Sequence, residues 1–284
     1  MREPIMRKVK GDDVNLQLAV WEGDKNQILC IHGLTANCRC WDVLASALTP
    51  SHCVLAMDLR GRGLSEKPSS GYSVEHHCRD ILAIMDNMGL DSAVLMGHSL
   101  GALISLIFTA EHADRVDRLI LVDGAGKLDE MQMNRVLAGI KPSLDRLEQI
   151  FPSFEAYLGT MKLAPFLQPW SSAMENYFHH EVEDLDGGVR SRVRLEHIQE
   201  EIQNMGKIDV SQFYSMIHCP ALILRATEGM LARDDLVLPE EVAGRMVREI
   251  PHVRSVDVEG TNHYSIIFQP NEVRDNAITD FLSG

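Results

Sequence analysis

Basic residues are few in this sequence of 284 residues, and acidic residues outnumber them. Lys and Arg together number 27 against 41 Asp and Glu, so the formal net charge at pH 7 is −14. Such a charge repels nucleic-acid phosphates and anionic lipid headgroups unless positive side chains gather in one place. The densest basic stretch runs only from Arg7 to Lys10, and we interpret it as a solvated start of the chain. We therefore expect neither a nucleic-acid partner nor a membrane partner.

Long apolar runs are absent as well. No run approaches the roughly 20 residues that a helix needs to cross a bilayer. The segment from Met1 to Asp12 also lacks the apolar stretch of a signal peptide. We therefore expect a cytoplasmic protein, and the sequence does not distinguish a monomer from a dimer.

The cysteines do not form a metal-binding or redox pattern. There are six, without a C-x-x-C pair, and the spacing of Cys38 and Cys40 does not suit a zinc knuckle. We interpret all six as small buried side chains in a reducing compartment: Cys30, Cys38, Cys40, Cys53, Cys78 and Cys219. We expect no metal and no cofactor.

What the sequence does contain is an alternation of short apolar runs and longer helical patterns. The runs are continuous, as in strands that are covered on both faces, and they span residues 14–21, 27–31, 53–57, 93–96 and 118–122. The clearest helical pattern begins after Ser73, a good N-cap residue, and ends at Gly89. Strands that alternate with helices predict a mostly parallel sheet.

The alternation stops after Gly126. Residues 127–215 read as helical, without a convincing strand, and the alternation resumes with strands at 221–225 and 253–258 and a last helix near Pro270. We predict a core domain of residues 1–126 and 216–284, and a helical cap of residues 127–215. Such a cap would lie over the carboxyl edge of the sheet, where open α/β sheets place their sites.

One motif carries the chemistry. Gly97-His98-Ser99-Leu100-Gly101 fits G-x-S-x-G, follows an apolar strand and opens a helical stretch from Leu100 to Glu111. This context is that of a nucleophile elbow, a tight turn that exposes a serine and requires tiny residues on either side of it. We predict that Ser99 is a nucleophile and that His98 is a packing residue.

A serine hydroxyl needs a base that takes its proton. His263 follows the strand at 253–258 in a loop before the last helix, so the serine precedes the histidine along the chain, as this arrangement requires. We therefore predict His263 as the base. Four other histidines, which we expect to be solvated and free of metal, lie in helical patterns without a carboxylate at ligand spacing: His76, His77, His179 and His180.

Taken together, four segments resemble an α/β-hydrolase-fold serine hydrolase with a helical cap over essentially the whole chain. They are Ile31 to Leu34, Asp58 to Ser65, Gly97 to Gly101, and Asn262-His263. The resemblance implies an eight-stranded, mostly parallel sheet flanked by helices, with the cap inserted after strand 6. It also implies an oxyanion hole made by the backbone N–H groups of Leu34 and Leu100.

The resemblance leaves the acid of the triad open. Most family members carry it after the strand that corresponds to 221–225, where this chain offers Glu228, Asp234 and Asp235. A minority carries it after the preceding strand, and Asp123 occupies that point. We favour Asp123, whose role would be to hold the tautomer of His263 and to stabilise its charged form.

The implied activity is cofactor-free hydrolysis of a carboxylic ester, lactone or activated amide of small to medium size through an acyl-enzyme. Carbon–carbon bond hydrolysis, acyl transfer and ligand sensing by a receptor of the same fold remain alternatives. The predicted cap contributes weaker signals. Its methionine and aromatic residues could line an acyl pocket but are more often core, and we expect Arg190, Arg192 and Arg194 on a solvated helix face.

Overall fold

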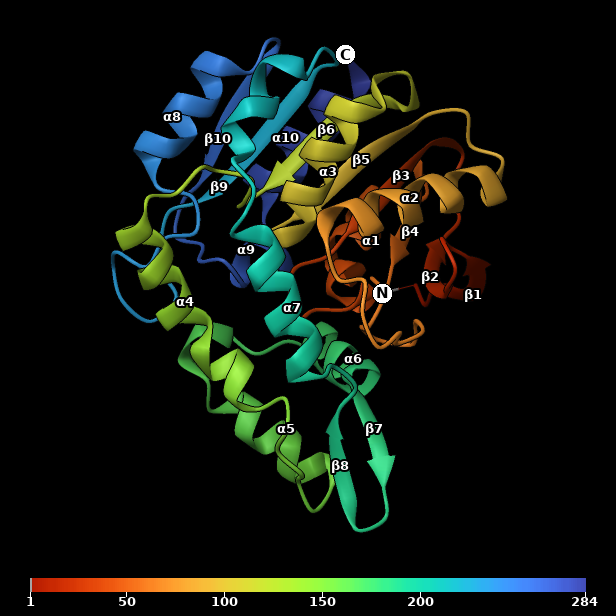
Figure 1. Cartoon of the computed structure of the whole chain (residues 1–284), viewed down its shortest axis with the longest axis vertical. Coiled ribbons are helices and arrows are strands. Elements are labelled where there is room, and N and C mark those ends of the chain that lie inside the picture. The colour runs from red at the N-terminus through yellow and green to blue at the C-terminus, as the bar shows by residue number, and fades with distance from the viewer. Residues whose placement is uncertain (1) are drawn as a thin grey trace.

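An eight-stranded sheet runs through the centre of the molecule (Figure 1). The structure, a computed structural model, describes residues 2–284, so Met1, the first residue of the predicted core segment, lies outside the described residues. The spatial order of the strands is β1-β2-β4-β3-β5-β6-β9-β10. Their bounds are β1 (Ile5–Lys10), β2 (Asn15–Trp21), β3 (Lys25–Ile31), β4 (His52–Met57), β5 (Ala93–His98), β6 (Val116–Val122), β9 (Ala221–Ala226) and β10 (Val253–Val258).

In this spatial order, the six strands from β4 to β10 pair with their neighbours in parallel, and β2 is antiparallel to both β1 and β4. This confirms the predicted α/β-hydrolase fold with its mostly parallel sheet. Each apolar run of the sequence becomes a strand within a few residues of the predicted ends. In this sheet, the strand that the residue pattern missed is β1, whose side chains are almost all exposed because it lies at the edge. The basic stretch from Arg7 to Lys10 belongs to this strand.

Helices cover both faces of the sheet. They are α1 (Asp42–Leu48), α2 (Val74–Met88), α3 (Leu100–Glu111), α8 (Glu240–Glu249), the short α9 (Ser265–Phe268) and α10 (Glu272–Ser283). In β3, Leu29 and Ile31 pack in one core layer with residues of α2 and α3, whereas Ile28 and Cys30 pack in the other with residues of α1 and α10. This burial on both sides explains why the strands read as continuous apolar runs.

Helix α2 shows how local sequence sets the ends of an element. The Ser73 side chain accepts a hydrogen bond from the backbone N–H of His76, and Gly89 takes the left-handed conformation with φ of 68° at the other end. Both features are the ones that the sequence predicted. No helix within residues 2–284 is long and apolar enough to span a membrane.

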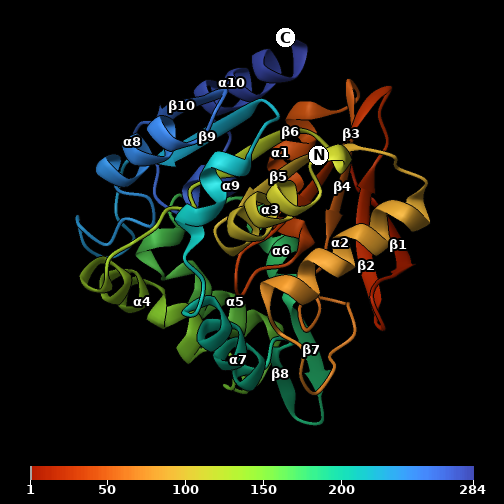
Figure 2. The same ribbon diagram turned by 45° about the horizontal axis from the view of Figure 1, so that its top comes forward.

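The chain between β6 and β9 forms a separate group of elements that lies to one side of the sheet (Figures 1 and 2). It contains α4 (Glu130–Asp145), α5 (Phe154–Lys162), α6 (Ser172–Glu181), β7 (Val182–Leu185), β8 (Gly188–Ser191) and α7 (Leu195–Met205). Strands β7 and β8 pair as an antiparallel hairpin, so the prediction that this segment has no strand is wrong. Each strand has only four residues, too few for an alternation of apolar and polar side chains to be read from the sequence. The division into core and cap domains stays a prediction.

Candidate active site

Ser99 lies in a strained turn at the end of a central strand. It connects β5 to α3 with φ of 57° and ψ of −120°, a conformation that non-glycine residues rarely adopt. The two flanking glycines make the turn possible, because a Cβ atom on Gly97 would lie 2.1 Å from the Gly101 carbonyl oxygen. A Cβ atom on Gly101 would lie 2.0 Å from the Ile31 carbonyl oxygen. The structure thus holds Ser99 in the geometry of a nucleophile elbow.

His263 and Asp123 meet although 140 residues separate them. The Nδ1 atom of His263 lies 2.7 Å from Oδ2 of Asp123, and both side chains are buried. A carboxylate can only accept a hydrogen bond, so Nδ1 carries the proton and Nε2 is left as the basic nitrogen. The second oxygen of Asp123 accepts a hydrogen bond from the backbone N–H of Ala226 at 3.1 Å. Asp123 is thereby held between β6 and β9.

The other candidate acids are engaged elsewhere. Asp235 accepts hydrogen bonds from the backbone N–H groups of Met230, Leu231 and Ala232 at 2.6 to 3.0 Å, so it closes its own loop. Asp234 is exposed and pairs with Arg135, and Glu228 is exposed as well. Within residues 2–284, none of these three carboxylates hydrogen-bonds to His263.

His98 supports His263 through the backbone. Its Nε2 atom lies 2.9 Å from the carbonyl oxygen of His263, and the two rings stack with centroids 4.5 Å apart. Burial holds the pKa of His98 well below its usual range, so the ring is neutral and donates from Nε2. His98 is therefore packed, as expected from the sequence, and it also fixes the loop that carries His263.

The loop that contains Leu34 approaches Ser99 closely. A Cβ atom on Gly33 would lie 3.1 Å from Cβ of Ser99. His32 fixes this loop, because its Nε2 accepts from the backbone N–H of Leu59 at 3.0 Å and its Nδ1 donates to the Gly33 carbonyl at 2.8 Å. Burial lowers the pKa of His32 to about 4, which keeps the ring in the neutral form that these two bonds require.

The two predicted oxyanion donors and two of the three predicted catalytic residues line one cavity, and the third, Asp123, reaches it only through its hydrogen bond to His263. The cavity has a volume of about 610 Å³, and Leu34, Ser99, Leu100 and His263 line it. We call it the Ser99 cavity. Leu137 and Ile140 of α4 and Ile202 and Met205 of α7 supply part of its apolar wall, among several other half-buried side chains.

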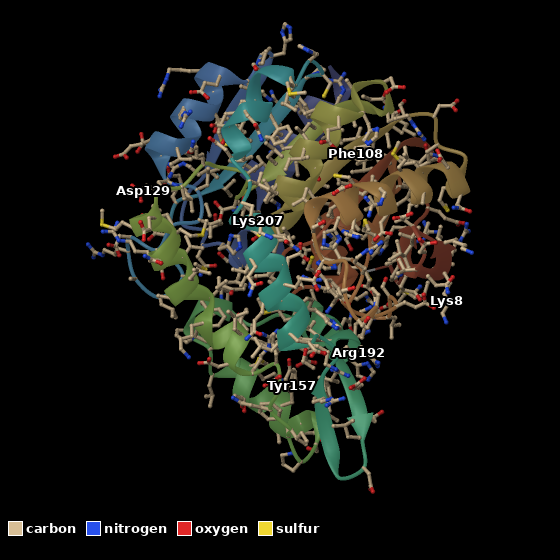
Figure 3. The ribbon with its side chains drawn as sticks, viewed as in Figure 1. Lys8, Phe108, Asp129, Tyr157, Arg192 and Lys207 are labelled. Carbon is tan, nitrogen blue, oxygen red and sulfur yellow. The ribbon has the colours of Figure 1, made fainter. Side chains whose placement is uncertain are left out.

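Charged residues around the Ser99 cavity are confined to its rim. The Lys, Asp and Glu residues that line it are all exposed: Lys127, Asp129, Glu130, Lys207 and Asp209. Asp129 and Lys207 lie at the ends of α4 and α7 that face the sheet (Figure 3). Lys127 is already paired with Asp209 at 2.5 Å. Among the residues that the structure describes, the interior of the cavity therefore offers no free cation to a substrate carboxylate.

A buried ionic cluster connects α7 to the loop beside Ser99. One oxygen of Glu201 lies 2.9 Å from Nη2 of Arg62 and 2.9 Å from Nε2 of His77, and all three side chains are fully buried. Arg62 in turn donates from Nε to the carbonyl of Leu34 at 3.0 Å. Our expectation that His77 is solvated is wrong, because its partner Glu201 lies 124 residues away and no local pattern reveals it.

His180 is likewise not a solvated helix residue. Its Nε2 atom lies 2.9 Å from Oδ2 of Asp58 and 3.6 Å from Sγ of Cys38. These two contacts join α6 to the sheet. Burial alone would raise the pKa of Asp58, but the hydrogen bond and the charge of His180 outweigh it and lower that pKa to about 2. These three side chains are close enough to hold a metal ion. The Asp58 oxygens, however, already accept backbone N–H groups of Cys38 and Leu64 at 2.7 and 2.8 Å.

The weaker sequence signals of the 127–215 segment concerned an acyl pocket and a solvated helix face. Among the methionine and aromatic residues of the 127–215 segment, Met133 and Tyr177 line the Ser99 cavity, and Met174 is core. The three arginines are not on a helix face. Arg190 lies in β8 and pairs with Glu183 at 2.9 Å. Arg194, which follows β8, pairs with the same carboxylate at 2.6 Å, and Arg192 donates to the His180 carbonyl.

Comparison with known proteins agrees with this architecture. Residues 26–270 match the family model described as alpha/beta hydrolase fold. The chain therefore belongs to the alpha/beta hydrolase fold family, and it is an enzyme of this class. One curated relative is 2-(acetamidomethylene)succinate hydrolase of Mesorhizobium japonicum, which is 26% identical over 92% of this chain and 89% of that protein.

Three further likenesses extend the comparison. A 3-hydroxybutyrate-oligomer hydrolase of Cupriavidus necator is 26% identical over 87% of this chain and 85% of that protein. The crystal structure of E-2-(acetamidomethylene)succinate hydrolase superimposes with a TM-score of 0.85 at 25% identity, covering 99% of this chain and all of that one. The enol-lactonase from Burkholderia xenovorans, at 21% identity and a TM-score of 0.74, shares the fold.

Proposed function

We propose that this protein is a cofactor-free serine hydrolase that cleaves a carboxylic ester, lactone or activated amide through an acyl-enzyme. Ser99 is the nucleophile, His263 the general base and Asp123 the acid that orients His263. The backbone N–H groups of Leu34 and Leu100 form the oxyanion hole. The observation that carries this proposal is the buried 2.7 Å hydrogen bond between His263 and Asp123 beside a cavity that Ser99 also lines.

The reaction follows from the roles of these groups. Ser99 Oγ attacks the substrate carbonyl while Nε2 of His263 takes its proton, and Asp123 stabilises the imidazolium that results. The N–H groups of Leu34 and Leu100 stabilise the oxygen that becomes negative, at the positive end of the α3 dipole. His263 then returns the proton to the leaving group. A water molecule, deprotonated by His263, releases the acyl group and restores Ser99.

The activities for which the relatives are named support hydrolysis at a carbonyl carbon. The names of these proteins describe hydrolases of an acetamidomethylene succinate and of 3-hydroxybutyrate oligomers, and an enol-lactonase. We further propose that residues 127–215 act as the cap of the site, that a small uncharged molecule is the substrate, and that the protein works in the cytoplasm.

Replacement of the nucleophile is the first test. Ser99→Ala should abolish the hydrolysis of p-nitrophenyl butanoate, because it removes the hydroxyl that forms the acyl-enzyme in the proposed mechanism. Ser70→Ala changes an exposed serine outside the site and is the matched control, which should retain the wild-type rate. Turnover by the Ser99→Ala protein at the wild-type rate would refute the mechanism.

The acid is tested by four conservative replacements. Asp123→Asn should lower kcat by about 10⁴, because the amide favours the wrong tautomer of His263. Asp234→Asn, Asp235→Asn and Glu228→Gln should each retain activity. If Asp123→Asn remains active while one of the other three does not, the acid is that residue instead.

A further inference from the structure

A second cavity lies directly behind the wall of the Ser99 cavity. It has a volume of about 420 Å³ and is enclosed mainly by α4, α5, α6 and the turn around Pro165. We call it the Met161 cavity, after a buried residue of α5 that lines it. Thr35, Tyr177, Tyr264 and Phe268 line both cavities, so the two spaces are separated by the thickness of these side chains.

Tyr264 forms the part of this wall that is nearest to the chemistry. It directly follows His263, and its hydroxyl lies 2.9 Å from Oγ of Ser143 in α4. Its ring packs against Phe166, with centroids 4.8 Å apart. The side chain is only partly buried, because it borders empty space on two sides. Within residues 2–284, one side-chain hydrogen bond and two ring contacts, to Phe166 and to His263, hold the Tyr264 ring, and its rotation would open this part of the partition.

The chemistry of the Met161 cavity favours an uncharged occupant. Met161, Phe166, Leu167 and Phe178 supply much of its wall, and all four are buried. Its one buried charge, Arg146, is neutralised by Glu181.

Each nitrogen of the Arg146 guanidinium also has a partner. Its Nη2 lies 2.6 Å from Oε1 of Glu181, its Nε donates to the Tyr157 hydroxyl at 3.3 Å, and its Nη1 donates to the Ser143 carbonyl. In the part of the chain that the structure describes, residues 2–284, the lining of this cavity holds no free cation for a carboxylate, whereas an alkyl chain or an aromatic ring would forfeit few hydrogen bonds and would bury apolar surface.

The position of His263 determines which part of the substrate lies toward the Met161 cavity. His263 protonates the leaving group, so the leaving group must be on the His263 side of the scissile bond. Tyr264 and Phe268, which separate the cavities, follow His263 in the same loop and in α9. The Ser99 cavity instead continues past Leu34 and Leu100 toward α4 and α7, which suits the acyl group.

We propose, on the basis of the function proposed above, that the Met161 cavity binds the leaving group of the substrate. The substrate class is an uncharged ester or amide whose alcohol or amine carries an apolar chain or ring, joined to an apolar acyl group in the Ser99 cavity. Rotation of Tyr264 away from Ser143 would let one substrate reach both cavities. This chain then differs in substrate from the relative that is named for a succinate.

The experiment compares the methyl, butyl and octyl esters of butanoic acid, with released acid titrated at constant pH. For the wild type, kcat/KM should rise with the length of the alcohol, by up to about fourfold for each methylene that becomes fully buried. Met161→Trp fills the cavity and should remove this rise. Met161→Ala enlarges it and should preserve the rise, so the proposal remains testable if the tryptophan variant does not fold.

The matched control is Met131→Trp. Met131 lies in α4, is 61% exposed and lines neither cavity, so this variant should show the wild-type dependence on alcohol length. The methyl esters of butanoic and octanoic acid test the acyl side separately. Met161→Trp should leave their kcat/KM ratio unchanged.

Three results would overturn the inference and leave the proposed function standing: no dependence on alcohol length in the wild type, the same dependence in Met161→Trp, or an effect of Met161→Trp on the acyl series instead. Failure of the wild type to hydrolyse any of these esters, including p-nitrophenyl butanoate, would instead refute the proposed function and the inference with it.

Discussion

The buried cluster of Arg62, Glu201 and His77 allows a quantitative prediction. Glu201→Gln preserves the size and shape of the side chain but removes the only negative charge of the cluster. The guanidinium of Arg62, whose exposed fraction is 0%, would then be left without a counter-charge. Because Arg62 also holds the carbonyl of Leu34, the change should reach the loop beside Ser99.

The magnitude follows from the burial. Breaking a buried ion pair from one side costs about 3–5 kcal/mol, because the remaining charge stays desolvated. For a domain of this size, 1 kcal/mol shifts the melting temperature by roughly 2–4 °C. The Glu201→Gln protein should therefore melt roughly 6–20 °C below the wild type at pH 7.

The assay is thermal unfolding followed by circular dichroism, with Glu196→Gln as the matched control. Glu196 lies in the same helix, but its side chain is 79% exposed, so its replacement should change stability by no more than about 0.5 kcal/mol. Equal melting temperatures for the two variants would refute the reasoning, because the buried charge would then contribute no more than the exposed one.

Three further predictions concern pH, the serine turn and metal. Burial raises the pKa of Glu201, but the charges of His77 and Arg62 outweigh it and lower that pKa to about 2. This depressed pKa stabilises the fold above the unfolded value of 4.5, and the contribution, about 3 kcal/mol, is lost as the pH falls from there toward 2. Urea unfolding at pH 6 and pH 3 should show the loss in the wild type and a smaller one in Glu201→Gln; the same loss in both would contradict the assignment. Gly101→Ala should destabilise the protein and abolish ester hydrolysis, because its Cβ would clash with the Ile31 carbonyl. Gly159→Ala, where a Cβ meets nothing within 4 Å, should be neutral or stabilising, and equal behaviour of the two would argue against a strained turn. Incubation with EDTA should leave ester hydrolysis unchanged. A loss of activity that a divalent metal restores would contradict this prediction, and the cluster of Cys38, Asp58 and His180 would be the first site to test by substitution.

Local sequence was sufficient for the fold and for the candidate nucleophile. The central strands are buried on both faces, and each one therefore has a continuous apolar sequence. The tight turn at Ser99 requires tiny residues on either side of it, and the motif therefore contains two glycines. Strand β1 and the β7–β8 hairpin were not predicted. Apolar patterns arise from buried side chains, and an exposed edge strand or a strand of four residues has few of them. The inserted segment was visible as a break in the alternation of strands and helices, and only the number of eight strands depended on the resemblance to a family.

The partners of the buried charges were decided by the tertiary structure. Sequence alone left Asp123, Glu228, Asp234 and Asp235 as candidate acids, because each lies in a loop after a strand and nothing local tells which loop reaches His263. The fold brings β6 beside β9, and the carboxylate at the end of β6 then lies against the imidazole, 140 residues away in the chain. A hydrogen bond depends on atoms within about 3 Å, and only the packing of the whole chain fixes such distances between remote residues.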